Sequence, residues 1–183
     1  MRRYLAQFLS DRRVIDLPRG LWLPILYGVI LNVRPRRSAR LYRRIWTEDG
    51  SPLVYLTQKI AAGLNVHLAQ AVQSPTSVAV GMRYGNPSIA AGLQELRDAG
   101  ATDLLILPLF PQYSRTTTAS ILDAVNEELA GWSFIPPVDV IEDYHDHPAY
   151  IQALQRSLLE RWAETGRPQR LLISYHGIPL RYV

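Results

Sequence analysis

The sequence of 183 residues contains no cysteine. It therefore supplies no disulfide, no thiolate metal ligand and no cysteine ligand for an iron–sulfur cluster, which fits a reducing cytoplasm. Lysine is represented by Lys59 alone, so the positive charge rests almost entirely on arginine. No nucleic-acid-binding motif accompanies that charge, and a nucleic-acid partner is therefore disfavoured.

Long hydrophobic runs are also lacking. The most apolar segment, residues 20–33, contains Pro24 and is shorter than the roughly 20 apolar residues that a membrane-spanning helix needs. It is not expected to cross a bilayer as a simple helix. Two interpretations remain open: a segment buried in the core, which we favour, or an exposed apolar lip that covers a hydrophobic ligand or rests on a membrane.

Charge is distributed unevenly along the chain. The net charge is +4, yet residues 1–44 contain 11 arginines and two acidic residues, Asp11 and Asp16, so the remainder is net acidic. This polarity indicates that the first quarter of the chain meets an anionic partner such as carboxylates, phosphates or a lipid surface. A solvated basic helix face explains the same pattern.

After residue 50, helical and strand-like patterns alternate. The spacing of apolar residues predicts helices over 51–72, 87–99, 116–130 and 148–164. Short apolar runs predict strands over 76–82, 103–109, 133–141 and 170–175. The alternation predicts an α/β fold in which a parallel sheet carries helices on both faces.

The two ends of the chain suggest an incomplete unit. The chain opens within a helical pattern rather than with the strand that usually begins an α/β domain, and it stops just after a predicted strand and its loop. We expect residues 1–165 to form one domain whose first strand is missing. Residues 166–183 are expected to lead into a second domain that is absent.

Ligands of open α/β sheets bind beyond the carboxyl ends of the strands, which singles out three loops. The first, residues 82–88, places Arg83 and Tyr84 before a helix start, where anions are attracted. Ordinary turn and cap chemistry accounts for these residues equally well. The second, residues 108–118, contains Tyr113 and a row of hydroxyl residues that suit either helix caps or the polar wall of a pocket.

The third loop follows the strand expected at 170–175 and contains His176. A neutral imidazole at this edge can accept a proton or bind a divalent cation, although a lone histidine is more often structural. His145 and His147 precede a predicted helix without the spacing of a zinc site. We retain His147 as a second candidate for a functional role.

Four motifs, in order and at suitable separations, resemble those of the bacterial ferrochelatases. They are Gly50-Ser51-Pro52-Leu53, Met82-Arg83-Tyr84-Gly85, Pro111-Gln112-Tyr113-Ser114 with its following threonines, and the stretch from Leu171 to Pro179 around His176. The resemblance covers essentially the whole chain. It implies two similar chelatase-like (Rossmann-like) α/β domains, of which this chain contains the first, with a porphyrin in the cleft between them.

The resemblance also implies a reaction, the insertion of ferrous iron into protoporphyrin IX or a related porphyrin in haem biosynthesis. His176 matches the essential histidine of the family, which is assigned to iron binding or to removal of the pyrrole protons. No cofactor beyond the substrate iron is implied. Because the acidic partner of this histidine lies in the second half of family members, we expect the chain to be an inactive fragment.

Further residues acquire roles only through the resemblance. Arg34, Tyr42 and Ser51 match positions near the porphyrin and its propionates. Arg83 matches a cleft position linked to the route of the metal, and Tyr113 is expected to shape the pocket wall. The apolar stretch matches the lip of the pocket, and its combination with arginines suits a flat apolar ring that carries carboxylates.

Partners and location follow from the same resemblance. We expect porphyrin and ferrous iron as ligands, the absent carboxy-terminal domain as a partner, and a cytoplasmic protein that residues 20–33 bring into peripheral contact with a membrane. A non-catalytic porphyrin-binding α/β module is the alternative. A nucleotide-binding Rossmann domain is disfavoured because no Gly-x-Gly-x-x-Gly follows any predicted strand.

Overall fold

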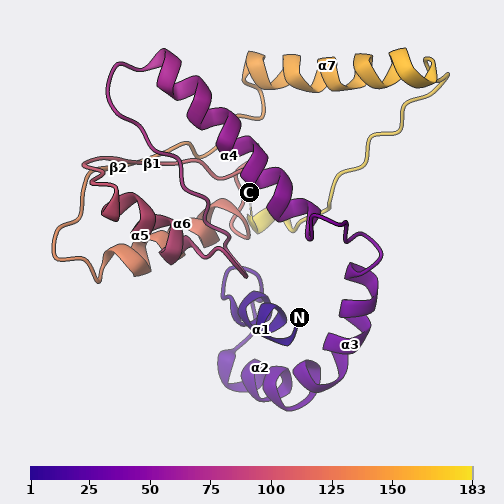
Figure 1. The fold of residues 1–183 in the computed structure, drawn as a ribbon. Coiled ribbons are helices and arrows are strands. Elements are labelled where there is room, and N and C mark those ends of the chain that lie inside the picture. Colours follow the sequence, from indigo (N-terminus) through magenta and orange to yellow (C-terminus); the bar gives the residue numbers. More distant parts are fainter. Residues whose placement is uncertain (183) are drawn as a thin grey trace.

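The computed structural model describes residues 1–182. Helices α1 (Arg2–Ser10), α2 (Arg19–Ile25), the π-helical turn η1 (Leu26–Ile30) and α3 (Leu31–Tyr42) form a helical group at the amino terminus. Helix α4 (Pro52–Ala71) leads from this group to a small α/β unit, and α7 (Pro148–Thr165) follows it (Figure 1). The chain ends in the short 3-10 turn η2 (Leu180–Tyr182).

The amino-terminal helices share an apolar core of their own. Leu5 and Leu9 lie one turn apart on α1 and pack against Leu26 and Leu31, all four of them buried. The indole nitrogen of Trp22 donates a 2.7 Å hydrogen bond to the carbonyl of Leu9, which joins α2 to the end of α1. This group therefore holds the segment over 20–33 in place.

The interpretation of residues 20–33 as a buried core segment is only half correct. Leu26 is fully buried, whereas Leu21 is 64% exposed and Val29 is 58% exposed. The remaining exposed apolar side chains of this stretch are Ile25, Tyr27 and Val33. An amphipathic helical segment buries one side only, so the opposite side forms an apolar surface beside the arginines of α3.

A second core lies in the α/β unit. Strands β1 (Leu104–Ile106) and β2 (Val138–Val140) pair in parallel, with Leu104 opposite Val138, and α6 (Thr118–Leu129) connects them. Leu104 packs with Ile89 and Leu93 of α5 (Ile89–Asp98) and with Val125 and Leu129 of α6. The predicted α/β class and the parallel order of these two strands are confirmed.

Within residues 1–182 the two faces of the short sheet are covered unequally. Successive strand residues point to opposite faces. Leu104 faces α5 and α6, while its neighbour Leu105 is 63% exposed. The helices that could cover the second face, α4 and α7, bury none of their residues and project from the unit (Figure 1).

Two of the four predicted strands do not form. Residues 76–82 make a single bridge, between Met82 and Ser88, and residues 170–175 have no strand pairing. A strand is defined by a ladder of hydrogen bonds to a neighbouring strand, and within residues 1–182 the only ladder is that between β1 and β2. The hydrophobic stretch at 170–175 is instead exposed, and the exposed fraction of Leu172 is 92%.

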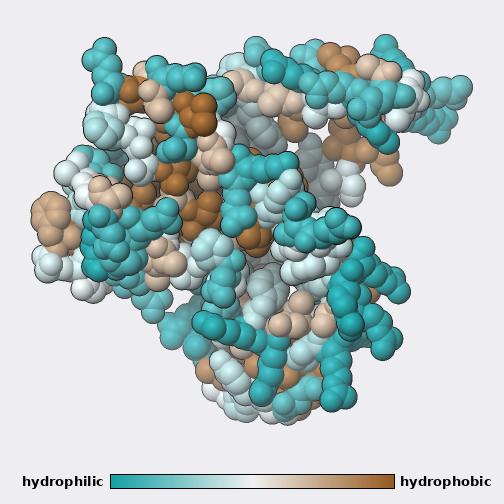
Figure 2. Space-filling view, in the orientation of Figure 1, coloured by the Kyte–Doolittle hydropathy of each residue, from teal (hydrophilic) through white to brown (hydrophobic). Residues whose placement is uncertain are grey.

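The predicted helices match the structure closely. The four expected after residue 50 appear as α4 to α7, with ends that differ by no more than two residues. None of the helices within residues 1–182 combines the length and apolar character needed to span a membrane. Figure 2 shows hydrophobic side chains at the surface along α4 and near α7, which accords with the absence of buried residues on both helices.

Candidate functional site

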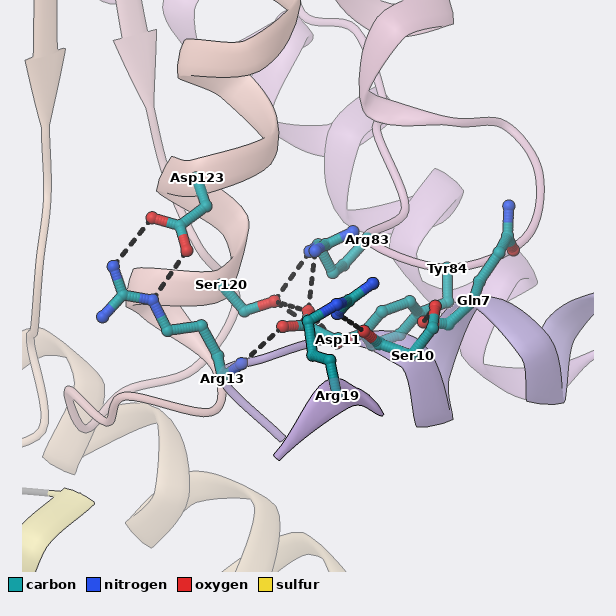
Figure 3. Close-up of polar contacts among 9 residues, drawn as sticks. All are labelled: Gln7, Ser10, Asp11, Arg13, Arg19, Arg83, Tyr84, Ser120 and Asp123. Carbon is teal, nitrogen blue, oxygen red and sulfur yellow. Dashed lines mark hydrogen bonds and ion pairs between the residues drawn. The ribbon is translucent and has the colours of Figure 1, made fainter. Parts of the chain in front are cut away.

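One buried carboxylate accepts several short hydrogen bonds from distant parts of the chain (Figure 3). Asp11 ends α1, and its side chain is only 4% exposed. Its Oδ2 accepts hydrogen bonds from Arg83 Nη2 at 2.6 Å, from the Tyr84 hydroxyl at 2.7 Å and from the Ser120 hydroxyl at 2.5 Å. Its Oδ1 accepts one from the backbone N–H of Arg13 at 2.7 Å. The carboxylate thus joins α1 to the 82–88 loop and to α6.

These donors keep Asp11 ionised. Burial by itself raises the pKa of this carboxyl, but the hydrogen bonds from Ser120, Tyr84 and the Arg13 backbone and the charge of Arg83 outweigh burial. The pKa of Asp11 is therefore lowered. A negative charge at this point supports a fixed positive charge beside it.

Arg83 is held at one edge of its guanidinium. Nη2 binds Asp11, and Nε donates a 2.7 Å hydrogen bond to Ser120 Oγ. The guanidinium also lies 4.8 Å from the ring centroid of Tyr84, and the side chain is 27% exposed. Among the described residues Nη1 has no hydrogen-bond partner, so this nitrogen is free to bind an anionic or electron-rich group.

The loop that carries Arg83 has a defined shape. Gly85 has φ +90°, a conformation that favours glycine, and its N–H donates a 3.0 Å hydrogen bond to Oε1 of Gln7 on α1. Tyr84 is pinned by its own bond to Asp11. Burial, followed by that hydrogen bond to Asp11, raises the pKa of Tyr84, so the phenol stays protonated as a donor.

An aromatic cluster extends this site to the end of α3. Tyr84 meets Phe8 edge-on at 5.3 Å and Tyr4 at 6.4 Å between ring centroids. Tyr4 in turn meets Tyr42 at 6.1 Å, and burial together with Tyr42 raises the pKa of Tyr4 to about 12. The structure therefore brings together two predicted site residues, Tyr42 and Arg83, through Tyr4 and Tyr84, which the sequence analysis did not assign.

Two other predicted residues lie nearby in the chain but outside this cluster. Arg34 is exposed on α3. Ser51 is the N-cap residue of α4, but its side chain makes no capping hydrogen bond. Both remain predictions as porphyrin contacts.

The loop before α6 supplies Tyr113, which is 39% exposed. The hydroxyl group of Ser114 lies 2.7 Å from that of Thr117 and 3.1 Å from that of Thr116, so the predicted row of hydroxyls bonds internally. The carbonyl of Tyr182 accepts a 2.7 Å hydrogen bond from the N–H of Arg115, which places η2 against this loop. In this structure the hydroxyl groups stabilise the loop before α6 through contacts with one another.

His176 does not occupy the end of a buried strand, as the sequence analysis expected. Its side chain is exposed, and Nδ1 lies 2.7 Å from the carbonyl oxygen of the adjacent Gly177. The reason is the unpaired segment at 170–175, because no strand fixes the direction of the following loop. Within residues 1–182 the imidazole makes no contact with the Asp11 cluster, so the structure does not bring His176 and Arg83 together.

His147 serves as the N-cap of α7. Its Nδ1 accepts a 3.2 Å hydrogen bond from the N–H of Ala149. The neighbouring Asp143, His145 and Asp146 each offer a ligand atom, and these atoms lie within 4.8 Å of one another. All three residues are exposed, and exposed acidic groups commonly gather in this way without a metal.

The site residues that sequence reasoning missed are Asp11, Ser120 and Tyr4. Each lies on the predicted inner side or end of a helix, where a polar residue or aromatic ring carries no special signal. A single sign was available: Asp11 is one of only two acidic residues within the arginine-rich first quarter. An acidic residue among so many arginines is a natural ion-pair partner.

Comparison with known proteins places this geometry in a family. A family model described as ferrochelatase matches residues 1–183. The ferrochelatase of Nitrosococcus oceani is 49% identical over 183 residues, which are 100% of this chain and 50% of the relative. That of Thioalkalivibrio sulfidiphilus is 47% identical with the same coverage, and ferrochelatase 2 of Shewanella oneidensis is 47% identical over 99% of this chain and 55% of the relative. The chain spans about half the length of the curated relatives it matches, and it belongs to the ferrochelatase family.

Proposed function

We propose that this chain forms the amino-terminal wall of a site in which ferrous iron is inserted into protoporphyrin IX or a related porphyrin, as a step of haem biosynthesis. One observation carries the proposal: in a chain that belongs throughout to the ferrochelatase family, Tyr42 and the Arg83–Tyr84 pair lie around a single aromatic cluster. An aromatic and cationic surface suits a flat macrocycle with anionic substituents.

The porphyrin is held by apolar contact and by charge. The exposed apolar side of α2 and η1, which includes Leu21, Tyr27 and Val29, faces the ring. Arg34 binds a propionate, since a guanidinium matches a carboxylate with two parallel hydrogen bonds. Tyr42 and Ser51 supply neutral donors beside it.

A second group of contacts acts on the reacting side of the ring. Arg83 presents Nη1, and Tyr113 contributes to the wall of the pocket. Binding energy from the propionate and apolar contacts, which lie away from the metal centre, is available to distort the ring and expose the nitrogen lone pairs to the incoming metal.

Insertion of a divalent cation requires the loss of two pyrrole protons, and His176 is the residue proposed for this role or for delivery of the iron. An imidazole titrates near neutrality, so it can accept a proton at physiological pH and bind a divalent cation when neutral. Because His176 is exposed, its imidazole is accessible to a partner surface. His147 is the second candidate, because the cap of α7 uses only its Nδ1.

The remainder of the site is proposed to come from sequence outside residues 1–183. The relatives are about twice as long as this chain, which supports a second wall that carries the acidic partner of His176. Ferrous iron is a substrate in this scheme. The chain contains no cysteine, so it offers no thiolate to an iron–sulfur cluster.

The same apolar side of α2 and η1 is proposed to make peripheral contact with a membrane in a cytoplasmic protein. Exposed Leu21, Ile25 and Val29 can enter the interface, and the arginines of α3 can meet anionic headgroups. This contact also suits delivery of a hydrophobic porphyrin from the bilayer.

The proposal is tested with the protein at its full encoded length. Ferrous iron and protoporphyrin IX are mixed with it under anaerobic conditions, and haem formation is followed by absorbance. Turnover above the rate without protein supports the proposal. Tight porphyrin binding without turnover would instead identify a non-catalytic binding module, and the absence of both would refute a porphyrin function.

A further inference from the structure

We propose that Asp11 is a positioning residue of the porphyrin site, because it fixes the direction in which Arg83 and Tyr84 face the substrate. The inference rests on the proposed function and adds to it a residue that does not itself touch the substrate. The role is assigned from the contacts of one carboxylate, seen in Figure 3 at the centre of the labelled side chains.

The Asp11 carboxylate binds donors from distant parts of the chain. Three hydrogen bonds meet at Asp11 Oδ2, and their donors come from sequence positions 72, 73 and 109 residues away. A carboxylate buried to this degree requires such partners, since an unpaired buried charge is strongly unfavourable. These hydrogen bonds therefore orient the three donor side chains as well as the carboxylate.

The guanidinium of Arg83 is anchored at two of its nitrogens. Two hydrogen bonds at different nitrogens fix both the position and the plane of a guanidinium group at the end of its flexible side chain. Nη2 is bonded to Asp11, Nε is bonded to Ser120, and the Ser120 hydroxyl itself donates to Asp11. Without the carboxylate, the Nη2 anchor is lost and the Ser120 hydroxyl loses the acceptor that orients it, so the direction of Nη1 is less well defined.

Tyr84 is held by the same carboxylate. Its hydroxyl donates to Asp11, while its ring packs edge-on against Phe8 and Tyr4. These contacts orient the ring that meets the same aromatic cluster as Tyr42. A change at Asp11 is thus expected to affect both Arg83 and the aromatic cluster around Tyr84.

A neighbouring ion pair provides a control that distinguishes the positioning of Arg83 from the connection of α1 to α6. Arg13 and Asp123 form two hydrogen bonds, of 2.6 and 2.8 Å, between the segment after α1 and helix α6. They connect the same parts of the chain as Asp11 and Ser120 do, yet they touch neither Arg83 nor Tyr84. Asp123 is therefore a matched control for any effect of weakened attachment.

The experiment compares Asp11→Asn with Asp123→Asn in the protein at its full encoded length. Orientation is read from the Nε–H signal of Arg83 in nitrogen-15 NMR spectra, assigned by its loss in Arg83→Lys. Affinity is read from titration with deuteroporphyrin IX, a soluble dicarboxylate porphyrin, followed by absorbance. We expect Asp11→Asn to shift or broaden the signal and to weaken porphyrin binding by about tenfold, the effect of one charged hydrogen bond. Asp123→Asn should leave the Nε–H signal of Arg83 in place and change the porphyrin affinity by no more than about twofold.

If Asp11→Asn fails to fold, Ser120→Ala removes the second anchor of Arg83 and should weaken porphyrin binding by about threefold or more, because the lost hydrogen bond is made by the charged guanidinium. Unchanged porphyrin affinity in folded Asp11→Asn, or equal losses in the two aspartate variants, would overturn the positioning role and leave the proposed function intact. If the unaltered protein binds no porphyrin, the proposed function fails and the positioning role fails with it.

Discussion

Ser120 and Asp11 are separated by 109 positions in the sequence, yet the hydroxyl of Ser120 donates a 2.5 Å hydrogen bond to the Asp11 carboxylate. Both residues are buried. The contact therefore connects the end of the first helix with the first turns of α6 inside the molecule, where its loss cannot be repaired by water.

Replacement of Asp11 by alanine should destabilise the protein by about 3 kcal/mol, because it leaves Arg83, Tyr84 and Ser120 without their shared acceptor. The exposed Asp123→Ala variant serves as control and should cost less than about 1 kcal/mol. Unfolding in urea measures both. Equal losses for the two variants would show that the burial of Asp11 has no special weight.

The stability contributed by Asp11 should depend on pH in a defined direction. Its pKa is lower in the folded protein than the usual aspartate value of 3.8, so its contribution is complete above that value and is lost as the pH falls through the folded pKa. Urea unfolding between about pH 2 and pH 6 should therefore show a steeper acid loss for the unaltered protein than for Asp11→Asn. Parallel curves would contradict a lowered pKa at Asp11.

His176→Ala should reduce iron insertion by about 100-fold or more at full encoded length, as expected for a positioned acid–base group, while porphyrin affinity remains. Because the imidazole is exposed and contacts only its neighbouring backbone, the melting temperature should hardly change. His67→Ala, at an exposed site of α4, is the matched control. Near-normal turnover of His176→Ala would remove this residue from the mechanism.

Arg34→Ala should weaken binding of a dicarboxylate porphyrin by about tenfold through the loss of a charged hydrogen-bonding partner. The dimethyl ester of the same porphyrin should bind the two proteins equally, because it carries no carboxylate for Arg34 to meet. Titrations followed by absorbance compare the four combinations. A similar loss for the ester would show that Arg34 acts through packing rather than through charge.

The chain of residues 1–183 should self-associate when it is purified alone and should show no iron insertion. Helix α4 presents Leu53, Leu56 and Ile60 on one side, with exposed fractions of 66, 54 and 52%. An apolar surface of this kind attracts a partner. Sedimentation should give a smaller average mass for Leu56→Gln than for the unaltered chain, and a monomeric unaltered chain would contradict this expectation.

Local sequence patterns predicted the helices and the paired strands well. The helix over 148–164 follows from its apolar spacing and from Pro148 at its first position, and it appears as α7. The parallel order of β1 and β2 follows from the helix between them. Segments 76–82 and 170–175 failed as strands because pairing depends on neighbours that a local pattern does not specify.

The candidate site was predictable where a motif carries it and not where tertiary contacts build it. Arg83 stands in a recognisable loop that the sequence singled out, and its role at a porphyrin site stays a prediction. Asp11 acquires its role only from donors far away in sequence, and no period or spacing reveals them. The position of His176 depended on a strand at 170–175, so the prediction of its surroundings failed together with that strand.

The amino-terminal helices and the α/β unit have separate apolar cores, around Leu26 and around Leu104. What lies between them is a junction of charged, hydroxyl and aromatic groups centred on Asp11. Hydrogen bonds are directional whereas apolar contacts are not, so this junction sets the angle between the two units rather than merely holding them together. Protonation of the Asp11 carboxylate would therefore weaken the directional part of this junction, while the apolar core of each unit and the Arg13–Asp123 pair stay in place.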